Sequence, residues 1–390
     1  MNAHDRYTCP VCALLSLLAA GPTALAYPPD PNNAALLYYQ AFISLPVDQG
    51  QMRRTVSGLP FGVDPNAQIR DYLEQCLTAI NLAGAASQIQ ACDWGIRYSQ
   101  GSLAPMPHLV QMRTLAWVLR GDAVVLAADH QHRQAIERCL TLRRMANHVD
   151  DETVISFIVS TSLNSLADKA ILEVLGVMPP DEKTLVWLES QWEVAPTGDL
   201  QIENAIRGEE KFCLGEKGMD KDLLMEQVKL SENLSPDQVE QLRKADDAFL
   251  EASLRYRTTH FQSALAILAG TDPYLKKLAQ LEALEKKPES DAEQDPHAIL
   301  AIVMGKPYTR LLILDMRARS NHTLLKTAIE VYLAKARTGS VPDQLPPGVP
   351  KDPFNGQDFK YEKAPEGFTL TRWTDDPAKD KNYRFTFKVR

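Results

Sequence analysis

Through the long middle of the chain, apolar residues recur at every third or fourth position, and this period predicts α-helices. A short amphipathic helix is expected to begin after Asn32 or Asn33, either of which can cap it. A second helix is expected over residues 66–83, and a third is expected to start at Pro107. Residues 27–339 are therefore expected to form an irregular antiparallel bundle or array of helices.

Two later helices carry clearer signals. Residues 152–176 are apolar nearly all round, with Ser and Thr where a surface helix would carry charges, which is typical of a central, buried helix. The order Ser235, Pro236 and Gln238 predicts a helix start with a capping box. The polar stretch 285–296 contains two prolines and is expected to be an exposed loop.

The pattern changes after Gly339. A proline-rich connection is followed by three runs, 358–363, 367–373 and 383–390, in which apolar and polar residues alternate. A period of two between turn residues predicts a three-stranded antiparallel β meander with one solvent-exposed face. The expected fold class is mainly α, with residues 340–390 forming the connection and a meander that packs on the helical domain.

Residues 1–26 have the features of a signal peptide. Arg6 precedes an apolar run over residues 13–20, and Ala24-Leu25-Ala26 fits a cleavage site. We expect cleavage near Ala26 and export to the periplasm or the extracellular space; the alternative is a buried N-terminal helix. Because no other apolar stretch reaches the roughly 18 residues needed to span a bilayer, the mature chain is expected to have no transmembrane segment.

The net charge of −8 argues against nucleic-acid binding, because phosphate contacts need clustered Lys and Arg. Removal of the leader takes away one Asp and one Arg and leaves that charge unchanged. The arginine-rich stretch 130–148 is better explained as a solvated helix face.

Four cysteines follow the leader: Cys76, Cys92, Cys139 and Cys213. An exported protein meets an oxidising compartment, so a Cys76–Cys92 disulfide is one expectation, with a stabilisation of about 3 kcal/mol. The alternative is that all four are buried thiols that pack as small apolar residues.

Candidate chemistry is sparse. The histidines lack zinc-protease spacing, and the chain has no P-loop, Gly-x-Gly-x-x-Gly or Gly-x-Ser-x-Gly motif, so we expect neither a metal nor a cofactor. The best acidic cluster contains Glu209 and Glu210 beside Arg207. Two carboxylates across a cleft are what a glycoside hydrolase uses, and His108 and Arg113 are candidate neighbours. The alternative is a solvated helix face with local ion pairs.

The loop "CDWG", residues 92–95, offers one candidate binding residue. Trp94 is either a platform for a ligand or a plug between helices, with Asp93 accepting from loop N–H groups and Gly95 permitting a turn.

Two stretches resemble uncharacterised exported helical proteins of planctomycete-type bacteria. They are the order "CDWG…G…PHL…R", from Cys92 to Arg113, and the tail pattern "YLAKARTGSVPDQL…DPFNG…Y…GFTL", from Tyr332 to Leu370. The resemblance rests on these two stretches and implies no activity. The tail also resembles the end of pseudopilins, but the N-terminal region lacks their basic leader and long apolar helix.

Together these observations predict an exported, non-catalytic binding or scaffold protein of the periplasm or cell envelope. Its expected partner is a cell-envelope protein or a glycan. The rival hypothesis is a hydrolase, acting on glycans, that uses a carboxylate around Glu209 and Glu210.

Overall fold

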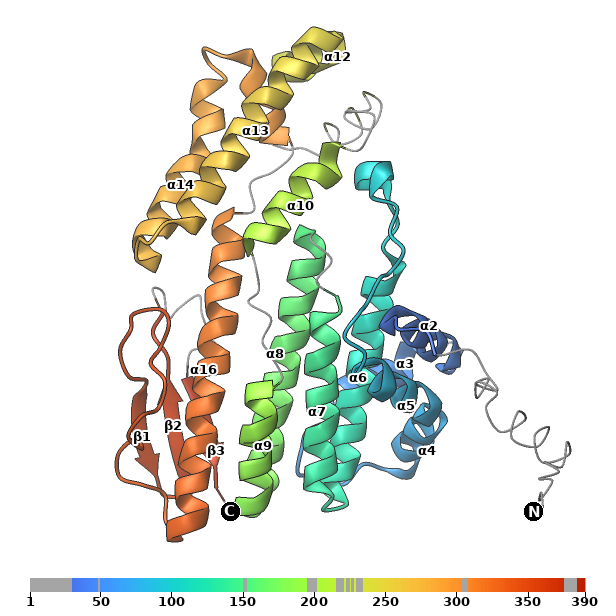
Figure 1. Ribbon diagram of the computed structural model, residues 1–390, viewed down its shortest axis with the longest axis vertical. Helices are drawn as coiled ribbons and strands as arrows, with labels where there is room; N and C mark the ends of the chain where they lie inside the picture. Colours follow the sequence, from blue (N-terminus) through green and yellow to red (C-terminus); the bar gives the residue numbers. More distant parts are fainter. Residues whose placement is uncertain are drawn as a thin grey trace, which may run out of the picture. The chain divides into compact units, whose positions relative to one another are not determined.

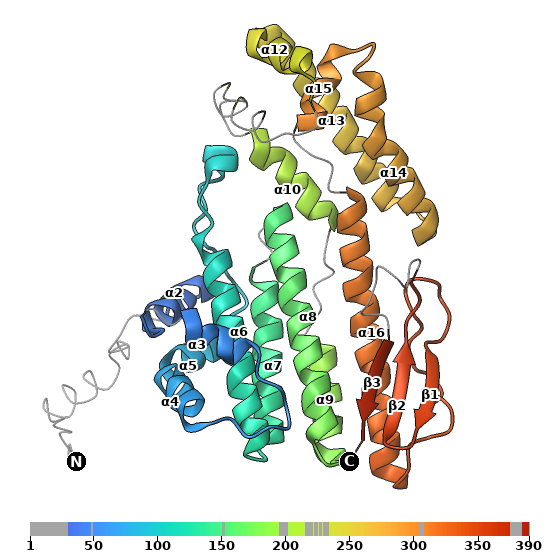
Figure 2. The ribbon, with the colours of Figure 1, turned by 180° about the vertical axis from the view of Figure 1, so that it is seen from behind.

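Four long helices form the centre of the fold, and they lie side by side in both ribbon views (Figures 1 and 2). They are α6 (Pro107–Ala128), α7 (His132–Asn147), α8 (Val154–Val177) and α16 (Tyr308–Thr338). The computed structural model describes residues 30–47, 50–149, 153–194, 202–214, 221, 225, 228, 234–303, 308–374 and 384–389. Within the chain, Asn33–Arg390 form one compact unit. The expected leader, residues 1–26, lies outside the described residues.

The other helices pack against this centre or against one another. Those on the N-terminal side, against α6, are α2 (Ala34–Ser44), α3 (Gly50–Ser57), α4 (Ala67–Gln75) and α5 (Leu77–Ala86). The later ones are α9 (Glu182–Val194), α10 (Ile202–Leu214), α12 (Pro236–Lys244), α13 (Asp247–Ala269), α14 (Tyr274–Asp291), η2 (Pro296–Ala298) and α15 (Ile299–Val303). The 3₁₀ turn η1 (Tyr98–Leu103) packs against the later helix α10. The mainly helical fold class is thus as predicted.

Helix α8 is central, as its apolar sequence predicts. Its buried side chains belong to three of the hydrophobic cores formed by the described residues. The first core joins α8 to α2, α4, α5 and α6; the second joins it to α7, α9, α16 and the sheet; the third joins it to α10, α13, α14 and α16. A fourth core, built from α12, α13 and α15, contains no residue of α8.

Several helix starts follow the predicted capping chemistry. The side chain of Asn33 accepts from the N–H of Ala35 at 3.1 Å and caps α2. Ser235 and Gln238 form the reciprocal capping box of α12. Thr153 and Ser156 form a second capping box at the start of α8. Each pair satisfies N–H groups that the helix leaves without an intrahelical partner.

Two expected boundaries are wrong. Residues 66–83 form two helices, because the chain bends at Cys76, whose N–H bonds back to the carbonyls of Tyr72 and Leu73 and whose side chain is buried at the bend. Residues 285–296 are not all loop, because α14 continues to Asp291 with Pro288 inside it. An interior proline costs about 3 kcal/mol of helix propensity, and the packing of α14 on α13, α15 and η2 outweighs that cost.

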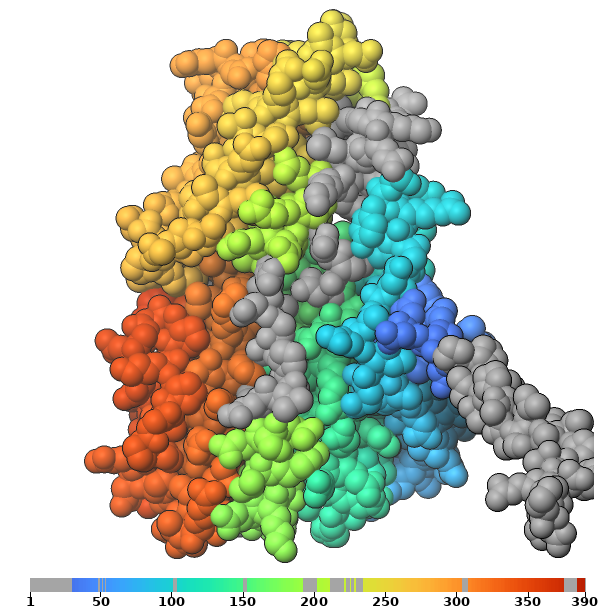
Figure 3. Space-filling view, in the orientation of Figure 1, coloured from blue at the N-terminus to red at the C-terminus, as the bar shows by residue number. Residues whose placement is uncertain are grey.

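The C-terminal sheet confirms the predicted meander, with strand order β1 (Lys360–Ala364), β2 (Gly367–Thr371) and β3 (Arg384–Lys388). Phe368 pairs with Phe387, and their stacked rings are buried in the second core. The hydroxyl of Tyr332, on α16, donates to the carbonyl of Lys388 at 2.8 Å. The sheet therefore lies directly against α16, as the space-filling view shows (Figure 3).

Gly367 is required by the close approach of β2 and β3. Its φ of +155° is a conformation that other residues rarely adopt, and a Cβ at this position would overlap the carbonyl oxygen of Phe387. The turn between β1 and β2 therefore depends on a residue with no side chain.

Among the described residues, the helices between Pro296 and Thr338 meet the criteria of length and apolar composition for crossing a membrane. However, 57% of their most apolar window is buried inside the unit. Helix α16 also carries Ser320 and His322, which form hydrogen bonds with Asp352 and with Arg143 of α7. These are the properties of a core helix.

Candidate functional site

The acidic cluster of α10 lies beside the first turn of α8, where Glu209 acts as a cap. The N–H of Val154 donates to Glu209 Oε2 at 3.0 Å. A carboxylate at this position satisfies an N–H group of the first turn and interacts favourably with the helix dipole. Glu210 is half-buried and Arg207 is exposed on the same helix. Glu209 therefore has a structural role that requires no catalytic one.

Replacing Glu209 with Ala should lower the free energy of unfolding by about 1 kcal/mol, because α8 loses an acceptor at its N-terminus. Urea unfolding followed by circular dichroism measures this change. Glu210→Ala is the matched control and should change stability by less than about 0.5 kcal/mol. Equal losses in the two variants would show that the cap is not what Glu209 contributes.

Trp94 lies in the first core and is only 7% exposed. Its ring stacks on His108, with centroids 4.4 Å apart, and on Tyr38 at 5.6 Å. Its indole N–H donates to the carbonyl of His148 at 2.6 Å. Protein side chains cover the ring, which leaves little of it available as a ligand platform. The plug between helices is the role that fits.

The loop around Trp94 is fixed by its polar neighbours. Asp93 Oδ1 accepts from the N–H of Gly95 at 2.8 Å, and Gly95 has a φ of +67°. The side chain of Asn33 accepts a hydrogen bond from the N–H of Asp93 and donates one to the carbonyl of Asp93, which ties the loop to the start of α2.

Arg113 is exposed, whereas His108 is buried. The two candidate neighbours of a carboxylate therefore differ in their access to solvent.

The expected Cys76–Cys92 disulfide is not present. Cys76, Cys92 and Cys139 form no disulfide, and the side chain of Cys213 lies outside what the structure describes. Cys76 lies just before α5, whereas Cys92 follows the loop after Ala86, and both are free thiols. Burial raises the pKa of the Cys76 thiol to about 11, so this thiol packs as a neutral side chain.

A buried polar triad connects α7, α8 and α16. The guanidinium of Arg143, fully buried, forms an ion pair with Asp168 and donates to His322 Nδ1 at 2.7 Å. Because arginine has only donors, Nδ1 of His322 must be the unprotonated acceptor. Burial and the adjacent charges of Arg143 and Lys326 lower the pKa of His322 to about 3. The triad therefore has a structural function and holds a neutral imidazole.

The titration of His322 predicts a pH dependence of stability. The folded state holds the imidazole neutral down to about pH 3, whereas the unfolded chain takes up a proton near pH 6.5. The unfolded state therefore binds more protons in this window, and stability falls as pH decreases, by up to about 1.4 kcal/mol per pH unit. From pH 7 to pH 4, the unfolding free energy of the wild type should therefore fall by more than that of His322→Gln. A constant difference between the two proteins would contradict the assignment.

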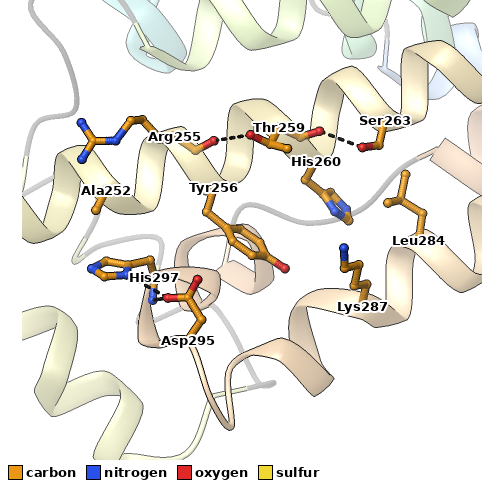
Figure 4. Close-up of a pocket in the computed structure, with 10 residues that line it drawn as sticks. All are labelled: Ala252, Arg255, Tyr256, Thr259, His260, Ser263, Leu284, Lys287, Asp295 and His297. Atoms are coloured by element: carbon orange, nitrogen blue, oxygen red, sulfur yellow. Dashed lines mark hydrogen bonds and ion pairs between the residues drawn. The ribbon is translucent and has the colours of Figure 1, made fainter.

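A cavity of about 300 Å³ lies between α13, α14 and η2 (Figure 4). Arg255, Tyr256, Thr259 and His260 come from α13, and Leu284 and Lys287 from α14, with Asp295 and His297 closing one end. In the close-up, the ring of His260 and the ammonium group of Lys287 point toward one another across the space. The cavity thus gathers several titratable side chains.

The carboxylates around this cavity are engaged in hydrogen bonds. The hydroxyl of Tyr256 donates to Asp291 at 2.6 Å. Asp295 Oδ1 lies 2.8 Å from His297 Nδ1 and also accepts that residue's backbone N–H. Burial and the bond to Asp291 raise the pKa of Tyr256 well above its usual value, so the phenol stays protonated. Arg255 is paired with Glu251 at 2.8 Å on the outer surface.

Sequence reasoning missed this site. His260 and His297 are far apart in the chain, and no local motif joins them. A hairpin of α13 and α14 returns the chain on itself and brings the two histidines to one cavity. The available signal was the spacing of Tyr256 and His260, which are one helical turn apart on α13.

The described residues include no group of three His, Cys, Asp or Glu side chains arranged to hold a metal ion. In comparisons with protein-family models, curated proteins and solved structures, none matches this chain. The candidate function therefore depends on the geometry of the cavity alone.

Proposed function

We propose that the chain is an exported, non-catalytic binding protein whose ligand site is the cavity between α13, α14 and η2. The observation that carries the proposal is the cavity itself: it is open, about 300 Å³ in volume, and lined by both charged and neutral polar groups. Small-ligand sites are concave surfaces of this size with a few convergent polar groups. Export follows from the expected cleavage near Ala26.

The arrangement favours binding over hydrolysis. A carboxylate that acts as a general base must be directed at a substrate, whereas Asp291 and Asp295 are already hydrogen-bonded to Tyr256 and His297. The carboxylate of Glu209 is likewise engaged by the start of α8. The rival hydrolase hypothesis gains no support from these positions.

The proposal is tested with the full chain and a panel of small carboxylates, phosphates, amines and sugars, observed by saturation-transfer NMR. Thr259→Trp should abolish the signal of any true ligand, because Thr259 lines the cavity and a bulky ring fills it. Gln262→Trp is the matched control, because Gln262 is exposed on the same helix and lies outside the cavity. Signals that survive Thr259→Trp, or an empty panel, would overturn the proposal.

The hydrolase hypothesis is tested separately with a screen for glycan and peptide hydrolysis. Glu209→Gln and Glu210→Gln are the diagnostic variants. Turnover lost in either variant would favour the enzyme and contradict a purely binding role.

A further inference from the structure

A second depression continues the cavity along the groove between α13 and α14. It has an open volume of about 590 Å³ and is lined by Ile267, Gln280, Ala283, Leu284, Lys286, Lys287 and Ser290. Leu284 and Lys287 line both spaces. The polar cavity and the depression are therefore adjacent sections of one groove, joined at these two residues.

The two sections differ in character. The first holds Tyr256, His260, Asp295 and His297 and is polar. The second is mostly apolar and presents the aliphatic side chains of Ile267, Ala283 and Leu284. A ligand that occupied both sections would need a polar end and an apolar end.

The charges along the groove favour an anionic head group. Among the residues that line the two sections, the cationic ones are Arg255, Lys286 and Lys287, and the acidic one is Asp295. Asp295 already interacts with His297, and Asp291, just behind the lining, accepts from Tyr256. Arg255 shares its charge with Glu251. Lys287 is thus the cation placed at the junction, with its ammonium group directed into the polar section (Figure 4).

We propose that the ligand is a single-chain amphiphile with one anionic head group, carboxylate or phosphate, and an aliphatic tail. The head lies at Lys287 beside His260, and the tail lies along Ile267, Ala283 and Leu284. This inference rests on the proposed binding function and names its ligand class. Complementary charge attracts the head, and burial of methylene groups stabilises the tail.

Isothermal titration calorimetry of the full chain tests the class directly. The probes are decanoate, octanoate, decyl phosphate, decylammonium and acetate, all below the concentrations at which micelles form. Decanoate should bind about fourfold more tightly than octanoate, because an open groove buries roughly half of each added methylene. Acetate and decylammonium should bind at least tenfold more weakly than decanoate. Comparing the dissociation constants of decyl phosphate and decanoate distinguishes the two head groups.

Two variants separate the head from the tail. Lys287→Met should weaken the binding of decanoate about fivefold, as expected for the loss of a partly exposed ion pair. It should also reduce the preference of the protein for decanoate over decylammonium. Ala283→Glu places a carboxylate in the apolar section and should weaken decanoate at least tenfold while leaving acetate unchanged. Lys183→Met and Ala266→Glu are matched controls at exposed helical positions outside the groove.

The outcomes distinguish this inference from the proposed function. Acetate as tight as decanoate, or no effect of Ala283→Glu, would overturn the amphiphile and leave the polar cavity as the binding site. Decylammonium as tight as decanoate would overturn the anionic head. If no probe binds here and the NMR panel is also empty, both proposals fail.

Discussion

Replacing Arg143 with Met should lower the free energy of unfolding by about 3–5 kcal/mol. The substitution keeps most of the side-chain volume but removes the charge that faces Asp168, which is itself buried. Asp168 would then have to remain charged in a low-dielectric interior or take up a proton to fold. Urea unfolding at pH 7, followed by far-UV circular dichroism, measures the loss.

The matched test is the double variant Arg143→Met with Asp168→Leu. It removes both charges at once, and replacing a buried ion pair by apolar residues is often neutral. We therefore expect it to recover most of the stability lost in Arg143→Met. A double variant as unstable as the single one would show that the hydrogen bond to His322, rather than the ion pair, dominates at this position.

Replacing Trp94 with Ala should cost a further large amount, about 3–5 kcal/mol, because a buried aromatic ring leaves a cavity that its neighbours fill only in part. The ring packs on Tyr38 and His108, and its N–H satisfies the carbonyl of His148. Thermal unfolding and urea unfolding both report this loss.

Trp94→Phe divides the two contributions. It retains most of the ring packing but leaves the His148 carbonyl without its indole donor, so a loss of about 1–3 kcal/mol is expected. A value near that of Trp94→Ala would mean that the hydrogen bond carries most of the energy. A Trp94→Ala variant as stable as wild type would contradict the core role of this residue.

Local signals in the sequence were sufficient for much of the fold. The apolar character of α8 predicted its central position, and the capping box at Ser235 and Gln238 predicted the start of α12. The alternation after Gly339 predicted three strands, because a period of two is typical of a half-buried strand and does not fit a helix. Each of these predictions depends on side chains close together in the chain.

The failures involve contacts between distant segments. Pro288 signals a helix end locally, yet α14 continues because of what it packs against. Cys76 and Cys92 are close in sequence, but α5 lies between them. The cavity between α13 and α14 depends on a hairpin whose second helix extends into the expected loop, so local patterns could not bring Tyr256 and His297 together.

The place of α8 in three cores has a consequence for cooperativity. Phe157, Leu163 and Ile171 belong to the third, first and second cores respectively, so none of these cores can open without disturbing the others. The fourth core shares no residue with α8. In native-state hydrogen exchange, amides of α12 and α15 should therefore exchange through a partial opening, while those of α8 exchange only on global unfolding. Helix α13 contributes to both the third and the fourth cores. A ligand bound in its groove should therefore slow amide hydrogen exchange first in α12 and α15, the helices that open most readily.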